Sequence, residues 1–113
     1  MSDTIFDKIL AKQIPAKVAY EDQEVLAFHD IHPQAKVHVL VIPKRKARSL
    51  NDLRSWEPKD VGIFFQKVAE VAHHIGVGAH GYRVVVNTGA GGGQTVDYVH
   101  AHILSGELSG EFG

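Results

Sequence analysis

The longest regular pattern of apolar positions lies between Pro58 and Gly76. Apolar side chains recur there every three or four residues, at Val61, Phe64, Phe65, Val68, Val71, Ala72 and Ile75. This spacing predicts an amphipathic helix, for which Pro58 suits the first turn and Gly76 the C-terminal end. A shorter helical pattern comes from Ile5, Phe6, Ile9 and Leu10. We expect Asp3 to cap this second helix and Pro15 to lie beyond its end.

The other apolar segments are short and rich in β-branched residues, which indicates strands. We expect strands at residues 18–21, 24–28, 37–42, 81–87 and 98–104. Their order with the helices predicts an α+β fold, in which an antiparallel sheet of about five strands carries the long helix on one face. No repeat or linker interrupts the chain. We therefore expect a single domain over residues 1–113, with a frayed tail from Ser105 to Gly113.

Alternation along the last predicted strand brings two histidines together. Tyr98, His100 and His102 would share one face, and Val99, Ala101 and Ile103 the other. Two imidazoles held on rigid backbone can be a nucleophile with its helper, or half of a metal site. In the metal alternative, His38 from another strand joins them in a three-histidine zinc site with an open position. The remaining alternative is a pair of half-buried histidines that only satisfy each other's hydrogen bonds.

A glycine-rich loop, Gly89–Gly93, precedes the histidines. It matches no nucleotide-binding signature, and on its own it is a permissive turn. Side-chain donors surround it, however, at Asn87, Gln94 and Thr95, so loop and donors together could hold a small anion. Asp30 could accept the two hydroxyls of a ribose, or could simply form a turn. Apolar residues that could line a slot for a base, although core is their default role, are Phe6, Ile9, Phe28 and Ile31.

Composition narrows the classes of function. The chain has 113 residues, 44% of them hydrophobic, and a net charge of −1, so no basic field attracts nucleic acid or anionic lipid. It has no cysteine, which excludes thiolate catalysis and thiolate zinc sites. The first residues show no signal-peptide pattern, and no apolar run approaches the roughly 20 residues of a membrane span. We expect a cytoplasmic protein without a membrane partner.

Taken together, these segments resemble the histidine triad (HIT) family, and within it the Hint branch. The resemblance runs from Asp3 to Gly106 with its segments in order and in register. The segments that carry it are Ile14-Pro15-Ala16-Lys17, Leu26-Ala27-Phe28-His29-Asp30-Ile31, Pro33-Gln34-Ala35, His38-Val39-Leu40-Val41-Ile42-Pro43-Lys44, Gly81-Tyr82-Arg83-Val84-Val85-Val86-Asn87 and Gly92-Gly93-Gln94-Thr95-Val96.

The resemblance implies a homodimer whose two sheets join, a purine nucleotide site, and hydrolysis of a nucleoside phosphoramidate or mixed anhydride without a metal or other cofactor. The nucleophile would fall on His100, the third triad histidine on His102 and a supporting histidine on His38. Phosphate and leaving-group contacts would fall on Asn87, Gly93, Gln94 and Thr95, and the ribose contact on Asp30. The base pocket would fall on Ile5, Phe6, Ile9, Phe28, His29 and Ile31.

Two positions depart from the family pattern. Tyr98 stands where the first triad histidine is expected, and a phenol with a pKa near 10 cannot become a cation at neutral pH. The tail, Ser105 to Gly113, lacks the glycine pair, arginine and tryptophan that usually follow the triad. These departures support an alternative function, a purine-nucleotide-binding protein with little or no catalysis.

Overall fold

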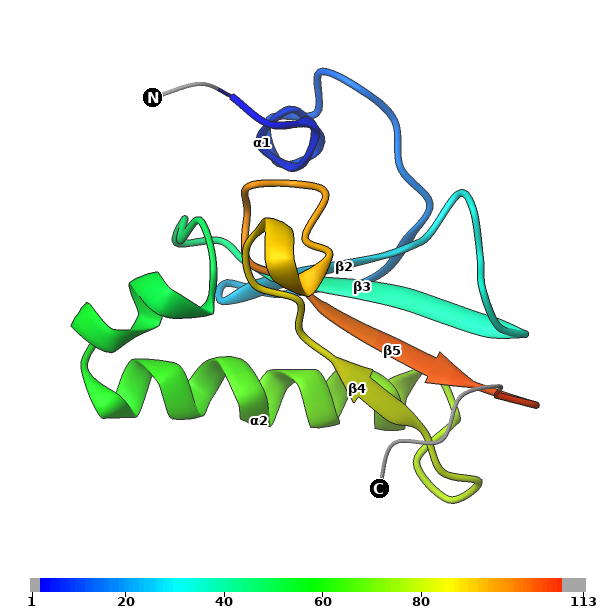
Figure 1. The fold of residues 1–113 in the computed structure, drawn as a ribbon. Helices are drawn as coiled ribbons and strands as arrows, with labels where there is room; N and C mark the ends of the chain where they lie inside the picture. The colour runs from blue at the N-terminus through cyan, green and yellow to red at the C-terminus, as the bar shows by residue number, and fades with distance from the viewer. Residues whose placement is uncertain (1–2, 109–113) are drawn as a thin grey trace.

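Five strands form one antiparallel sheet, and two α-helices lie on its opposite faces (Figure 1). The computed structural model describes residues 3–108. The strands are β1 (Val18–Glu21), β2 (Val25–His29), β3 (Val37–Pro43), β4 (Arg83–Val85) and β5 (Ala101–Ser105), in the spatial order β1-β2-β3-β5-β4. The helices are α1 (Ile5–Leu10) and α2 (Pro58–His74), and two short 3-10 turns are η1 (Leu50–Ser55) and η2 (Ala90–Gly92). The predicted α+β class and the five-stranded sheet are confirmed.

Alternation along the strands divides the apolar residues between two cores. The core beneath α2 takes the odd-numbered strand residues and the helix face, Val25, Ala27, Val39, Val41, Ala101, Ile103, Phe64, Val68, Val71 and Ala72. The core beneath α1 takes the even-numbered residues, Leu26, Phe28, Leu40, Ile42 and Tyr98, and closes around Phe6. Burial of both sheet faces explains why the strands are nearly continuous apolar runs rather than alternating ones.

The long helix begins and ends where its sequence predicts. Pro58 is its first residue. Gly76 adopts a φ of 88°, a left-handed conformation that favours glycine, and the next amide, of Val77, donates to the Ala72 carbonyl at 3.0 Å. Among residues 3–108, no helix is long and apolar enough to cross a membrane.

The cap of α1 differs from the prediction. Thr4, not Asp3, is the N-cap residue, and its hydroxyl accepts the amide of Asp7 at 3.2 Å. The Asp7 carboxylate in turn accepts the Thr4 amide at 2.7 Å, which completes a capping box with an aspartate in the usual place of glutamate. Asp3 lies one residue too early to make this reciprocal pair.

The last two strands are shorter than predicted. β5 begins at Ala101, so that Tyr98, Val99 and His100 precede it. Extending its register with β3 would place Val99 opposite Pro43, which has no amide hydrogen to donate. The Val99 amide donates to the Ala47 carbonyl instead, at 2.7 Å. The frayed tail predicted from Ser105 to Gly113 is wrong at its first residue, because Ser105 ends β5, is buried, and donates its hydroxyl to the Gly81 carbonyl at 2.7 Å. Residues 109–113 of this tail lie outside the described part of the chain.

Candidate active site

The three histidines singled out in the sequence come together on the α1 side of the sheet. His38 lies on β3 and His102 on the neighbouring β5, where their ring centroids are 5.1 Å apart. His100 directly precedes β5, and its ring lies 4.9 Å from that of His102. The side-chain alternation predicted for Tyr98, His100 and His102 therefore holds, although only the last of the three is in the strand.

One backbone amide fixes the protons on two of these rings. The Gln34 amide, which can only donate, lies 3.1 Å from Nδ1 of His38, so this nitrogen accepts. Nε2 of His38 then carries the hydrogen and donates to Nδ1 of His102 at 2.9 Å. Since Nδ1 of His102 accepts, its Nε2 carries the remaining hydrogen. A carboxylate oxygen of Asp30 lies 3.4 Å from Nε2 of His38 and favours this arrangement.

His100 has the opposite arrangement of donor and acceptor. Its Nδ1 lies 2.7 Å from the Tyr98 carbonyl, which can only accept, so Nδ1 carries the hydrogen. Nε2 of His100 therefore holds a lone pair. The ring is 4% exposed and packs edge to face against Phe6 at 5.0 Å between centroids. A carbonyl and an aromatic ring thus fix both its tautomer and its orientation.

The environment keeps all three imidazoles neutral. Burial lowers the pKa of His100 from 6.5, and the Tyr98 carbonyl and Asp30 oppose this only in part. Burial also lowers the pKa of His38, again against the charge of Asp30. For His102, burial and then the neighbouring His100 and His38 lower the pKa to about 4. At neutral pH the site therefore presents one imidazole lone pair and one imidazole N–H.

A cavity of about 230 Å³ opens in front of His100 and His102. Its walls are mostly apolar and come from α1, from the segment that follows α1, and from the end of β2. The predicted site residues that line it are Ile5, Phe6, Ile9, Phe28, His29, Asp30, Ile31, Thr95, His100 and His102. A mostly apolar cavity with a few convergent polar groups is the usual form of a small-molecule site.

Several predicted phosphate residues do not line this cavity. The side chain of Gln94 accepts the Gly89 amide at 2.8 Å and donates to the carbonyls of Arg48 and Val96 at 2.7 and 2.9 Å. The hydrogen-bonding groups of the Gln94 side chain are therefore used to hold the glycine-rich loop in place. Asn87 is half-buried beyond β4, and Gly93 ends η2 in a left-handed conformation. Their predicted contact with phosphate stays a prediction.

Sequence reasoning did not assign a role to other residues that line the cavity, Ile14, Pro15, Ala16, Leu40 and Val96. The run 14–16 follows α1, and its Ile-Pro pair reads only as a helix stop. Leu40 and Val96 read as core. No local pattern separates an apolar residue that lines a cavity from one that fills a core, and only the packing of α1 over the sheet distinguishes them.

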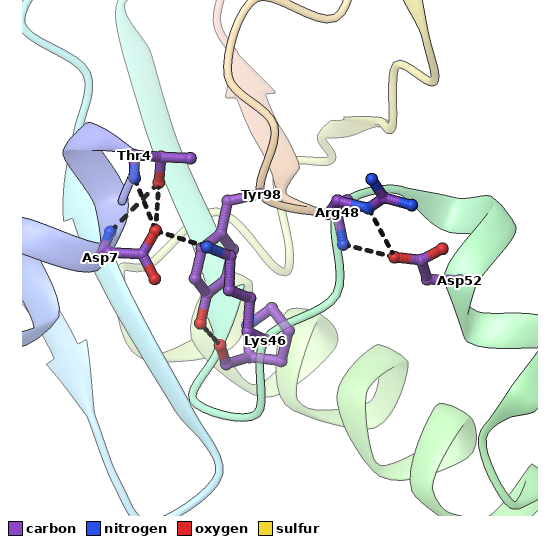
Figure 2. Close-up of polar contacts among 7 residues, drawn as sticks. Thr4, Asp7, Lys46, Arg48, Asp52 and Tyr98 are labelled. Atoms are coloured by element: carbon purple, nitrogen blue, oxygen red, sulfur yellow. Dashed lines mark hydrogen bonds and ion pairs between the residues drawn. The ribbon is translucent and has the colours of Figure 1, made fainter. Parts of the chain in front are cut away.

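The residues around Tyr98 form a polar network beneath α1 (Figure 2). The Tyr98 hydroxyl donates to the Pro43 carbonyl at 2.6 Å, and the side chain is fully buried. Nζ of Lys46 lies 5.9 Å from the centre of the Tyr98 ring and donates to the Asp7 carboxylate at 2.9 Å. Burial raises the pKa of Tyr98 further above its usual value, so the phenol stays protonated.

The structure does not assemble the three-histidine metal set. Within residues 3–108, the donors close enough to share an ion are Asp30, His38 and His102, whose ligand atoms lie within 4.8 Å of one another. His100 is not among them. The hydrogen bond between His38 and His102 occupies two of the three ligand atoms, and an ion would have to displace its proton.

Comparison with known proteins gives one consistent result. The model of the HIT domain matches residues 11–108. The purine nucleoside phosphoramidase of Escherichia coli K12 is 38% identical over 108 residues, which cover 96% of this chain and 91% of that protein. A HIT-like protein of Synechococcus elongatus is 45% identical over 104 residues, which cover 92% and 90%.

Solved structures agree. A histidine triad protein from Clostridium difficile superposes with a TM-score of 0.88 at 38% identity, over 100% of this chain and 98% of that one. A HIT family hydrolase from Legionella pneumophila gives a TM-score of 0.86 at 38% identity, over 94% and 95%.

Proposed function

Because the chain belongs to the HIT family, we propose that it is a nucleotide hydrolase acting through a nucleotidyl-histidine intermediate. Its proposed substrates are purine nucleoside phosphoramidates or related conjugates of a nucleoside monophosphate. The observation that carries this proposal is the tautomer of His100. Its Nδ1–H is held by the Tyr98 carbonyl, and its ring lines the cavity with a lone pair on Nε2.

The cavity suits a nucleoside. Ile5, Ile9 and Phe28 supply an apolar wall for the base, and Asp30 supplies a carboxylate for the ribose hydroxyls. One Asp30 oxygen already accepts the His32 amide at 2.8 Å, which fixes the carboxylate in place.

In the proposed reaction, Nε2 of His100 attacks the α-phosphorus and forms a P–N bond. The bond to the leaving group breaks on the opposite side, and the leaving atom takes the electron pair and a proton from water, which leaves hydroxide. Hydroxide then attacks the phosphorus of the nucleotidyl-imidazolium, and the electron pair of the P–N bond returns to Nε2, which releases the nucleoside monophosphate and restores neutral His100. Nε2–H of His102 is available to a non-bridging oxygen, where negative charge is greatest.

Tyr98 takes no proton in this scheme. Its hydroxyl is bound to the Pro43 carbonyl and is buried, so it reaches neither substrate nor solvent. Its contribution is the backbone carbonyl that holds His100, which a residue of any type supplies. Residue 98 therefore still orients His100 through its backbone. It cannot take any role that needs an imidazolium at the first triad position.

The test is hydrolysis of adenosine 5′-phosphoramidate by the wild type and by His100→Ala. We expect turnover by the wild type and none by the variant. Mass spectrometry of acid-quenched protein should find a nucleotidyl adduct only on the wild type. His73→Ala is a suitable control because His73 is exposed on α2 and does not line the cavity. Equal turnover by wild type and His100→Ala would contradict the proposal.

The second candidate is a nucleotide-binding protein with little catalysis, and the burial of Tyr98 favours it. If the first triad position must supply a cation, this chain cannot supply one. AMP binding by calorimetry without turnover or adduct would establish this function instead. A Tyr98→His variant that gains turnover would identify the missing group.

We also propose that the chain forms a homodimer through an edge of its sheet. β1 and β4 are the two edge strands. β4 presents the exposed side chain of Val84, and Tyr82, directly before β4, is exposed as well. Exposed apolar residues beside unpaired backbone groups are suited to pairing with a second chain.

A further inference from the structure

One ion pair joins α1 to the segment that follows β3. Nζ of Lys46 lies 2.9 Å from Oδ2 of Asp7 and over the Tyr98 ring, 5.9 Å from its centre (Figure 2). The same Asp7 oxygen accepts the amide and the hydroxyl of Thr4, at 2.7 and 2.9 Å. Lys46 therefore binds the capping box of α1 and not merely a side chain on its surface.

This pair is more sheltered than its neighbour. The side chains of Lys46 and Asp7 are 23% and 19% exposed. Arg48 and Asp52, two and six residues further along the chain, form a pair at 3.5 Å with 67% and 39% exposure. Burial of Asp7 alone would raise its pKa, yet Lys46 and Thr4 hold the pKa below its usual value. Exposed pairs contribute little, whereas sheltered, hydrogen-bonded pairs contribute more.

Apolar packing also attaches α1 to the sheet. The helix spans six residues, too few for a helix to persist without tertiary contacts; Phe6 is buried, and Ile9 and Leu10 pack partly buried against the same core. The same helix supplies Ile5, Phe6 and Ile9 to the cavity wall. Phe6 also packs on His100 and on Tyr98, at 5.0 and 6.2 Å between centroids. The position of α1 therefore sets the shape of the cavity.

We propose that Lys46 and Asp7 are positioning residues for the nucleotide, and that their ion pair holds α1 over the cavity so that the base wall is formed before binding. Neither residue lines the cavity, and neither takes part in the chemistry. This inference rests on the proposed function, because it assigns α1 to the nucleoside. It predicts that loss of the pair weakens nucleotide binding more than it slows the chemical step, because the Tyr98 carbonyl still holds the His100 ring.

The test is AMP affinity by calorimetry for Lys46→Met, Asp7→Asn and the double variant. Methionine keeps most of the apolar stem of lysine, and asparagine can still accept from Thr4. We expect each single variant to bind AMP about tenfold more weakly, in line with a charged hydrogen bond. The double variant should bind no more weakly than the singles. Arg48→Met and Asp52→Asn are the matched controls, and these should bind like the wild type.

Turnover separates positioning from general damage. With adenosine 5′-phosphoramidate, Lys46→Met should raise KM by a larger factor than it lowers kcat, and Lys46→Arg should restore KM. If Lys46→Met binds AMP like Arg48→Met, or if kcat falls in proportion and Lys46→Arg does not rescue it, the inference is wrong.

Hydrogen exchange separates this inference from the proposed function. The amides of residues 5–10 should exchange faster in Lys46→Met than in Arg48→Met, whether or not AMP binds. A wild type that binds no AMP would end the proposed function, and with it the nucleotide role of the pair. Unchanged exchange in Lys46→Met would overturn the anchor itself.

Discussion

His100 and His102 lie two residues apart and hold their protons on different nitrogens. Nδ1 of His100 donates to the Tyr98 carbonyl, whereas Nδ1 of His102 accepts from His38. The sequence predicts that the two rings share a face, since that follows from strand alternation. It does not predict their tautomers, because those depend on a carbonyl and an amide whose positions only the fold determines.

The first prediction concerns pH. His100 must be neutral to attack, and burial lowers its pKa below 6.5, so kcat/KM should stay constant near neutrality and fall only below pH 6.5. Asp30 opposes this shift, so Asp30→Asn should move the acid limb to still lower pH. A pH–rate profile on the phosphoramidate measures both. A limb centred at or above 6.5 would contradict the assignment.

The same shifts predict the direction of a stability change. His38, His100 and His102 all bind protons more weakly in the folded chain than their ordinary pKa of 6.5 implies. The unfolded chain therefore binds more protons as the pH falls. The free energy of unfolding should decline from pH 6.5 downward, with the contribution of His102 lost toward pH 4. Urea unfolding at pH 7 and at pH 5 measures the free energy of unfolding at each pH, and we expect the smaller value at pH 5.

Replacement of Tyr98 by phenylalanine should separate stability from rate. The change removes a buried hydrogen bond to the Pro43 carbonyl and should cost about 1–2 kcal/mol of unfolding free energy. The carbonyl of residue 98 remains, so His100 keeps its orientation and kcat should change little. Thermal unfolding and steady-state kinetics on the same preparation give both values. A large loss of kcat would show that the hydroxyl has a direct role.

At the scale of elements, the glycine-rich segment forms a turn, which is one of its two predicted forms, and its contact with an anion stays a prediction. It is a 3-10 turn, η2, flanked by Gly89 and Gly93, which both have positive φ. Gln94 ties this turn to the Arg48 carbonyl, 46 residues earlier in the chain. A resemblance gives Gln94 a contact with the leaving group, and composition suggests an anion loop. Neither could show a long-range side-chain bond, because that bond depends on tertiary packing.

Gln94→Glu should loosen this turn. The change removes the amide that donates to the carbonyls of Arg48 and Val96, and sets a carboxylate against them. We expect a loss of about 1–2 kcal/mol in stability and a higher KM, since the adjacent Thr95 lines the cavity. Gln66→Glu, the same change at an exposed position of α2, is the control. Unchanged values in both variants would show that the turn does not need Gln94.

Other elements follow their local signals closely. α2 starts at its proline and ends at its glycine because both signals act through backbone geometry within a few residues. The start of β5 could not be predicted in the same way. It depends on Pro43, which lies on the partner strand and is distant in the sequence.

At the scale of the whole molecule, the two sheet edges differ in what they offer a second copy. β4 carries exposed Val84, and β1 carries exposed Val18 at the opposite edge. If the proposed dimer forms through β4, Val84→Lys should yield monomers and Val18→Lys should not. Light scattering after size exclusion measures the mass of each. A dimer that survives Val84→Lys would exclude this edge.

The general architecture was predictable because it depends on patterns that extend over many residues. Strand alternation, helical periodicity and residues such as Pro58 all indicate the same arrangement, and errors at single positions cancel. Most residues that line the cavity were predicted, but its form was not. Leu40 and Val96 line it although no local pattern separates them from residues that only fill the core.

The proton arrangement of the site begins outside the histidines, at the Gln34 amide in an exposed segment. Without that hydrogen, His38 could carry its proton on Nδ1, and the hydrogen bond between His38 and His102 would reverse its direction. Nε2 of His102 would then hold a lone pair and repel an anionic ligand. A peptide group that contacts neither the ligand nor the reacting atoms therefore determines whether the site attracts or repels negative charge.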